Sequence, residues 1–297
     1  MTKVIKNKRI AIMGSSPLMI ILFYFLKSKN KVVIFEEDNI PGGAWKLQKH
    51  KNTFINSYSN VVLPFNDKDY NKQIRINSII KKKRIGIKIK ESSKKIFALY
   101  KPKKYFEYDF SNMYVNFLKN LKNIKNSKVK KITLLENDKI RINEKKTFDL
   151  VFFPSYFGVD HFFFKEKKIN INFKSIKSSH VSVLTNNINQ KLIYSDFFNK
   201  HFDRVNMNKY KSFFHITARI TKKFKTSKLG FLKKKFAESF PGILIKKLII
   251  RKYKNYYRDQ YQLNNLKKKL NKTKIIYVNT TSFIAGIYQI LKLVHKY

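Results

Sequence analysis

The sequence predicts an α/β fold of the Rossmann-like kind, with a β-meander and an interleaved, reduced α+β part. Three observations favour this class: a strand, turn, helix and strand unit near the N-terminus, short strands after residue 129, and a closing strand and helix. At 297 residues the chain is long enough to bury a substantial core. No internal repeat or low-complexity linker divides it, so interleaved segments are expected instead of two modules in tandem.

The N-terminal unit begins with the apolar run Arg9–Met13. A turn at Gly14 and an apolar helical stretch up to Lys27 follow, and the β-branched run Val32–Phe35 ends in Glu36. Strand, glycine turn, helix, strand and acid form a βαβ unit. Its parallel strands are expected to be buried on both faces.

The central part of the chain predicts a helix and then a β-meander. Ser111 is suited to cap a helix whose apolar residues recur at spacings of three and four, namely Tyr114, Phe117, Leu118, Leu121 and Ile124. Three strand-like segments follow, VKKITLLE, DKIRIN and TFDLVFFPS, separated by polar turn residues. Val129–Ser155 is therefore expected to be a meander whose last strand returns to the core.

The remaining segments predict further strands, a basic helical region and a closing unit. Strand-like runs are RIGIKI within the basic stretch 72–104, then His180–Thr185, Lys191–Asp196 and Phe213–Ile220. A helical region is expected over 222–270, interrupted at Pro241-Gly242. The closing strand is Lys274–Val278 and the closing helix runs over 283–295.

The composition is globular with a large positive charge. The 65 Lys and Arg residues against 18 Asp and Glu give a net charge of +47, which alone suggests a nucleic acid, an acidic membrane surface or phosphorylated metabolites as partner. The basic residues are spread along the whole chain, however, and Lys, Asn, Ile, Phe and Tyr are all abundant. A bias of A/T-rich coding sequence is therefore favoured, and no specific nucleic-acid site is expected. A peripheral membrane contact through the basic surface stays open.

Several kinds of site are disfavoured by the sequence. The absence of cysteine excludes disulfides and thiolate ligands, and the six histidines lack metal-binding spacing, so no metal is expected. The apolar segments Leu18–Leu26 and Ile275–Val294 are expected to be buried elements of a cytoplasmic protein. The first is too short to span a bilayer, and polar residues interrupt the second.

These elements, in this order, resemble the flavin-dependent amine oxidase superfamily, in particular the branch around UDP-galactopyranose mutase and protoporphyrinogen oxidase. The resemblance covers the whole chain and depends on Glu36, the pair Gly42-Gly43 six residues beyond it, the meander, HFDRVN at 201–206 and the closing unit. It implies an FAD/NAD(P)-binding fold. The dinucleotide-binding domain is expected over 1–71, 111–158 and 271–297, and an interleaved substrate domain over 72–110 and 159–270.

The resemblance also implies a set of site residues. Those expected to contact FAD are Gly14, Ser15, Ser16, Glu36, Gly42, Gly43, Trp45, Val129 and Asn279. Among these, Glu36 is expected to accept hydrogen bonds from the adenosine ribose. Arg204 and Arg219 are expected to bind an anionic substrate, because a guanidinium offers two parallel donors to phosphate or carboxylate. No catalytic residue is predicted.

The chain departs from the dinucleotide fingerprint G-x-G-x-x-G, since it reads GSSPLM over 14–19. The Ser16 hydroxyl is suited to donate to phosphate, and Pro17 is acceptable in the first helical turn. Met19 replaces the third glycine and is expected to push the helix away from the sheet. Asn279 and the polar residues after it stand where the family usually has glycines beyond the last strand.

Three functions remain open at this point. The first is an FAD-dependent oxidoreductase or mutase-like flavoprotein acting on an anionic small molecule such as a nucleotide sugar. The missing nucleophile-base pair agrees with that function, because a flavin supplies the reaction chemistry itself. The second is a degenerate, non-catalytic relative that acts as a binding or scaffold protein, and the third is a basic nucleic-acid or membrane-surface protein. Use of NAD(P)H stays open.

Overall fold

The fold is taken from a computed structural model. It describes residues 5–50, 53–56, 61–62, 82–85, 88–89, 105–108, 110–144, 146–154, 161–164, 167–169, 174–186, 193–197, 201–210, 212–221, 228–240, 242–257, 268, 273–278 and 283–296. Within these ranges no helix is both long and apolar enough to cross a membrane.

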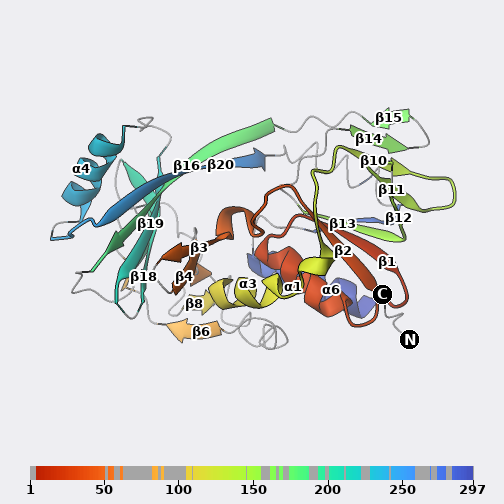
Figure 1. Cartoon of the computed structure of the whole chain (residues 1–297), viewed down its shortest axis with the longest axis horizontal. Helices are drawn as coiled ribbons and strands as arrows, with labels where there is room; N and C mark the ends of the chain where they lie inside the picture. The colour runs from red at the N-terminus through yellow and green to blue at the C-terminus, as the bar shows by residue number, and fades with distance from the viewer. Residues whose placement is uncertain are drawn as a thin grey trace.

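A five-stranded parallel sheet forms the centre of the larger lobe (Figure 1). Its strands, in spatial order, are β21 (Ile275–Val278), β13 (Leu150–Pro154), β1 (Arg9–Met13), β2 (Lys31–Glu36) and β9 (Ile124–Asn126). In the middle strand β1 the residues from Ile10 to Met13 are fully buried. The predicted α/β class with a parallel, Rossmann-like sheet is confirmed.

The parallel sheet lies between a layer of helices and a second sheet (Figure 1). Helices α1 (Pro17–Leu26), α3 (Phe110–Leu118) and α6 (Phe283–Lys296) pack on one face. The second sheet covers the other face and has the order β12 (Lys146–Phe148), β11 (Ile140–Ile142), β10 (Lys131–Leu134), β14 (His161–Phe164) and β15 (Lys167–Ile169). Its first three strands form the predicted meander, and β13 returns to the core as predicted.

The other lobe is built on a six-stranded, mostly antiparallel sheet (left in Figure 1). Its order is β20 (Lys247–Tyr257), β16 (Lys174–Thr185), β19 (Phe214–Ile220), β18 (Phe202–Lys209), β17 (Ile193–Phe197) and β7 (Lys88–Ile89). Helix α4 (Leu229–Ser239) buries Leu232 and Phe236 against one face of this sheet. The opposite face points toward the hairpin β3 (Leu47–His50) and β4 (Thr53–Asn56).

Smaller elements complete the fold. Strands β5 (Val61–Val62), β8 (Tyr105–Tyr108) and β6 (Lys82–Ile85) form a three-stranded sheet. Short 3-10 turns, η1 (Gly43–Trp45) and η3 (Leu121–Asn123), lie after β2 and after α3 respectively.

Four local predictions are wrong. Ser111 lies inside α3, which begins at Phe110, and Ile124 belongs to strand β9, because pairing with β2 outweighs its helical spacing. The basic region predicted as helix contains α4 but then the eleven-residue strand β20, which pairs with β16 along its length. The segment TFDLVFFPS is divided at Asp149 into β12 and β13, which enter different sheets.

The proposed division into domains stays a prediction. All five strands of the parallel sheet come from the segments assigned to the dinucleotide-binding domain. All six strands of the large sheet come from the segments assigned to the substrate domain. Strands β14 and β15 also come from the latter segments but extend the meander sheet.

Candidate functional site

The turn between β1 and α1 lies at the carboxyl end of the parallel sheet. Gly14 has φ of 74°, a left-handed conformation that favours glycine, and its N–H donates to the carbonyl of Phe35 at 2.7 Å. Ser16 is extended and stands at the N-cap position of α1 without a side-chain cap hydrogen bond, and Pro17 occupies the first helical turn as predicted. The glycine needed for this turn is therefore present although the rest of the fingerprint is absent.

Met19 does not prevent helix and sheet from packing together. Its side chain is fully buried in the same core cluster as Ile10 and Ile34 of the sheet. The prediction that Met19 separates helix and sheet is wrong in this respect, since the apolar contact between the two layers is retained. A methionine is flexible enough to fill the space available in a core of this kind.

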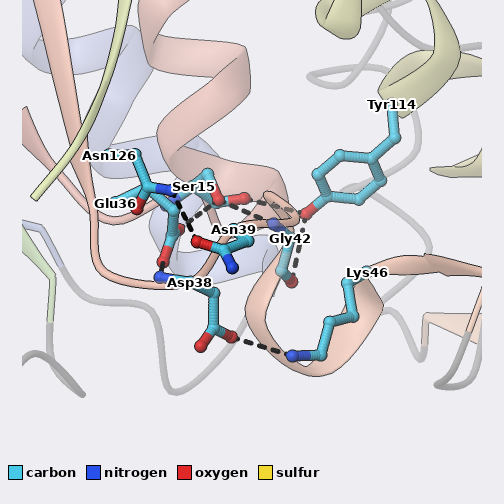
Figure 2. Close-up of polar contacts among 8 residues, drawn as sticks. All are labelled: Ser15, Glu36, Asp38, Asn39, Gly42, Lys46, Tyr114 and Asn126. Atoms are coloured by element: carbon cyan, nitrogen blue, oxygen red, sulfur yellow. Dashed lines mark hydrogen bonds and ion pairs between the residues drawn. The ribbon is translucent and has the colours of Figure 1, made fainter.

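Ser15 connects three segments at the turn (Figure 2). Its N–H donates to Glu36 Oε2 at 3.0 Å, and its hydroxyl donates to the same oxygen. The hydroxyl also accepts from the N–H of Gly42 at 2.6 Å, and the Ser15 carbonyl accepts from the Tyr114 hydroxyl at 3.0 Å. Ser15, Glu36, Gly42 and Tyr114 are called the turn cluster below.

Glu36 is the buried acid of the turn cluster, with 6% of its surface exposed. Its second oxygen, Oε1, accepts from the N–H of Asp38 at 3.1 Å. Burial raises the pKa of the Glu36 carboxyl, while the hydroxyl of Ser15 opposes that shift by hydrogen bonding to the carboxylate. Hydrogen bonds, and not a cation of the turn cluster, therefore stabilise the negative charge of the Glu36 carboxylate.

Gly42 and Gly43 form the tight turn that closes the cluster. Gly42 has φ of 121°, and a Cβ at this position would lie 2.7 Å from the backbone nitrogen and Cα of Lys46. Glycine is therefore required here by the chain's own geometry, whether or not a ligand approaches. At the rim, Lys46 Nζ lies 2.9 Å from Asp38 Oδ2 in a partly exposed ion pair.

Tyr114 is the member of the turn cluster that the sequence does not identify. In the sequence it is one of several apolar residues at helical spacing, and the structure buries it almost completely. Its hydroxyl points from α3 into the turn (Figure 2). Desolvation, with a smaller contribution from the charge of Glu36, raises its pKa well above the ordinary value. Tyr114 therefore acts as a neutral donor.

Of the other predicted site residues, Trp45 adjoins the turn cluster, because its N–H donates to the carbonyl of Gly42 at 2.8 Å. Trp45 packs edge to face on Phe110, with ring centroids 6.1 Å apart, and Val129 is fully buried under the meander. Arg219 is half-buried on β19, whereas Arg204 lies in β18 with a side chain outside the described part, and Asn279 falls outside the described residues. No group of three or more His, Cys, Asp or Glu in the described ranges is arranged to hold a metal.

The layered arrangement and the turn at the end of β1 define the class of fold. The chain has the fold of the flavin-dependent amine oxidase superfamily, as the predicted resemblance indicates. Neither family models nor curated proteins match the sequence.

Particular solved structures share this fold over their whole length. A putative protoporphyrinogen oxidase from Exiguobacterium sp. 255-15 matches with a TM-score of 0.64 at 7% identity, covering 98% of each chain. A reduced UDP-galactopyranose mutase matches with a TM-score of 0.64 at 8% identity, covering 98% of this chain and 93% of the other. A fatty acid isomerase from P. acnes that produces CLA matches with a TM-score of 0.61 at 10% identity, covering 99% and 100%.

The residues at the turn fit the polar parts of FAD. The hydroxyl of Ser16 is buried and has no hydrogen-bond partner, and it lies at the first turn of α1, where helical N–H groups lack intrahelical acceptors. This combination suits a pyrophosphate. Oxygen Oε1 of Glu36 accepts one N–H and keeps capacity for a ribose hydroxyl, whereas Oε2 is already engaged by Ser15.

Proposed function

We propose that this chain binds FAD at the turn cluster and acts as an oxidoreductase or mutase-like flavoprotein on an anionic small molecule. The observation that carries the proposal is the buried, unpartnered hydroxyl of Ser16 at the start of α1, beside the acid and the glycine turn. Ser16 and the first turn of α1 would hold the pyrophosphate, and Glu36 Oε1 would hold the ribose. A bound flavin supplies the redox chemistry, for which the protein provides binding and orientation.

An anionic substrate, such as a nucleotide sugar, is supported by the arginines of the large sheet. Arg219 of β19 and Arg251 of β20 both pair with His180 of the strand between them. Two half-buried guanidinium groups, on the strands that flank β16, create a positive region on this sheet. Phosphate or carboxylate is the group that suits such donors.

A second function, that of a non-catalytic binding or scaffold protein with the same fold, is favoured by a specific observation. Ser15 already engages Glu36 Oε2 and the N–H of Gly42, so these two groups are satisfied by the chain itself. The turn is therefore held together without a cofactor. Such a protein would keep the fold while taking up no flavin.

Flavin uptake separates the two functions. The purified chain is expected to be yellow or to become so on titration with FAD, read by visible absorbance and by fluorescence quenching. Glu36→Gln keeps the size of the side chain but removes its charge, and is expected to weaken FAD binding by about tenfold or more. The matched change Glu144→Gln, on an exposed meander turn, is expected to leave FAD affinity unchanged.

The outcomes differ clearly. A colourless protein that takes up no added FAD would exclude the flavoprotein and leave the scaffold protein. Equal FAD affinities for the wild type and Glu36→Gln would mean that flavin binds elsewhere than at the turn cluster.

A further inference from the structure

The exposed large apolar side chains of the described ranges are concentrated in one short segment. Four such side chains are exposed in these ranges, and three of them lie within 229–244: Leu229 at 51%, Phe231 at 42% and Leu244 at 66% exposure. The fourth, Ile40, lies after β2 in the other lobe. A single exposed leucine is common on a protein surface, whereas a group of exposed apolar side chains marks a contact surface.

Helix α4 and the segment after it share one core, which fixes the direction of the exposed side chains. Leu232 and Phe236 of α4 are buried in the core cluster of the large sheet, and Ile243 and Ile245 pack against the same cluster. Leu244 stands between these two isoleucines, and its own side chain is exposed. The exposed side chains are therefore held on the outside of a packed structure.

The position of α4 in the molecule leaves this surface open to a large partner. The helix lies at the outer end of its lobe, on the side away from the parallel sheet and the turn cluster (Figure 1). An extended, flat partner can therefore approach α4 without meeting the other lobe.

Lysines accompany the exposed apolar side chains. Residues 228–247 include six lysines and one glutamate and no other charged residue, so that this segment has a net charge of +5. The glutamate, Glu238, forms an ion pair of 2.7 Å with Lys235, whose Nζ also lies 5.6 Å from the centre of the Phe231 ring. The five remaining lysines are exposed: Lys228, Lys233, Lys234, Lys246 and Lys247. These lysines and the three exposed apolar residues of 229–244 are called the α4 surface below.

This combination of groups fits an anionic bilayer better than another macromolecule. Apolar side chains enter the boundary between headgroups and acyl chains, and lysines bury their stems while their ammonium groups stay with anionic headgroups. Lysine is depleted in the cores of protein–protein interfaces. A nucleic acid would use the lysines but gains little from exposed leucines, because its backbone contacts are electrostatic.

We propose that the α4 surface docks on a membrane that contains anionic lipids. Leu229, Phe231 and Leu244 enter the headgroup layer, and the lysines bind the negative groups of the lipids. Two signals of this kind, one apolar and one basic, are what a stable peripheral contact requires, since either alone gives weak and reversible binding. The contact goes beyond the proposed flavin function and does not depend on it, because the α4 surface and the turn cluster lie in different lobes.

The test measures co-sedimentation of the purified full-length chain with vesicles of phosphatidylcholine alone or with about 30% phosphatidylserine. The wild type is expected to bind the anionic vesicles at least about tenfold more tightly. Leu229→Asn/Phe231→Asn keeps every lysine and is expected to weaken this binding about tenfold or more, because the apolar contact is lost. The matched change Ile40→Asn, at an equally exposed apolar residue of the other lobe, is expected to leave vesicle binding unchanged.

A second pair of variants tests the basic signal. Lys233→Gln/Lys234→Gln keeps the apolar side chains and is expected to weaken binding to anionic vesicles about tenfold, with little change for phosphatidylcholine alone. Lys167→Gln/Lys168→Gln, at exposed lysines of the meander sheet, removes the same charge and is expected to have a much smaller effect.

Each outcome bears on the α4 surface. A wild type that binds neither kind of vesicle, or both equally, overturns the inference. Unchanged binding in Leu229→Asn/Phe231→Asn also overturns it, because the overall positive charge alone would then explain the contact. Duplex DNA is the third probe, and an equal loss of DNA binding in this variant would show that the effect is not specific for lipid. Circular dichroism checks folding, and Leu244→Asn replaces the double variant if that protein fails to fold, with weaker vesicle binding again expected.

Discussion

The turn cluster and the polar face of the large sheet are two buried polar regions that differ in hydrogen bonding. The polar face consists of His180, Ser182, Asn206, Asn208, His215 and Thr217, all at most 4% exposed. At the turn, the carboxylate of Glu36 and the polar groups of Ser15 are all paired within the chain. On the polar face, the amides of Asn206 and Asn208 have no partner. Burial of polar groups alone therefore does not identify a binding surface. The paired groups of the turn cluster stabilise the fold, whereas the unpaired amides of the polar face lower its stability.

The largest effect is expected where the satisfied cluster is broken. Ser15→Ala removes the hydroxyl that bridges Glu36 and Gly42 and leaves a buried carboxylate oxygen and N–H less well paired. We expect the free energy of unfolding to fall by about 2–3 kcal/mol, measured by urea denaturation. Ser127→Ala, where the hydroxyl makes one long bond of 3.4 Å at the surface, is the control and should change stability by less than about 0.5 kcal/mol. Equal losses of stability in Ser15→Ala and Ser127→Ala would contradict a bridging role for the Ser15 hydroxyl.

The second effect is a dependence of stability on pH that comes from the polar face. The pKa of His215 is about 3 in the folded chain against an ordinary value of 6.5, so between these values the unfolded chain binds a proton that the folded chain does not. Stability therefore falls as pH falls through this window, by about 2 kcal/mol between pH 7 and pH 5. Glu36 acts in the opposite direction, because its pKa is raised in the fold.

Urea denaturation at several pH values measures this dependence. His215→Gln is expected to remove most of the loss between pH 7 and pH 5, and Ser182→Ala, which keeps the histidine, is expected to retain it. Arg251 and His50 are the charged or titratable groups whose fields act on His215. An unchanged pH slope in His215→Gln would assign the dependence to another group.

A smaller effect of opposite sign is expected from replacing an unpaired amide. Asn206→Leu removes two buried atoms that lack partners and is expected to raise the free energy of unfolding by about 1 kcal/mol. Asn30→Leu is the matched change at a paired amide, since Asn30 Nδ2 donates to the carbonyls of Ile5 and Leu26 at 3.0 Å. It is expected to cost about 1–2 kcal/mol in thermal or urea denaturation. Destabilisation by both changes would show that Asn206 is already satisfied.

The smallest effect is expected at the rim of the turn. Asp38→Asn breaks the ion pair with Lys46 but keeps the backbone N–H that donates to Glu36. Because the pair is partly exposed, the change should lower stability by no more than about 0.5 kcal/mol, and added salt should reduce the difference. A loss of stability as large as that of Ser15→Ala would mean that the Asp38–Lys46 ion pair stabilises the turn as much as the Ser15 hydroxyl does.

The sequence predicts those elements of the fold that depend on local patterns of apolar and turn residues. Apolar runs around Gly14 predict the βαβ unit, and the meander follows from short strands with polar turns. Strand β20 is not predicted, because its basic residues resemble a helix surface and its conformation depends on pairing with β16. Strand propensity depends strongly on such distant partners.

The turn cluster and the polar face show the same limit. Glu36 and Gly42 are identified in the sequence by their spacing, but the bridge through Ser15 and Tyr114 joins residues up to 99 positions apart. On the polar face, alternation of Asn206 and Asn208 with buried apolar residues predicts side chains directed to solvent. In the fold both are at most 3% exposed, which no local pattern encodes.

Strand β16 carries a difference in rigidity along its own length. From His180 to Leu184 its residues pair with β19 on one edge and β20 on the other, whereas the described pairs of Lys174–Ser179 are with β20. At about 3.3 Å per residue the strand extends roughly 40 Å from the meander side into the large sheet (Figure 1). Amide hydrogens near Ser182 should therefore exchange far more slowly than those near Lys174. We therefore expect local opening of β16 to be rarer near Ser182, where both edges are paired, than near Lys174.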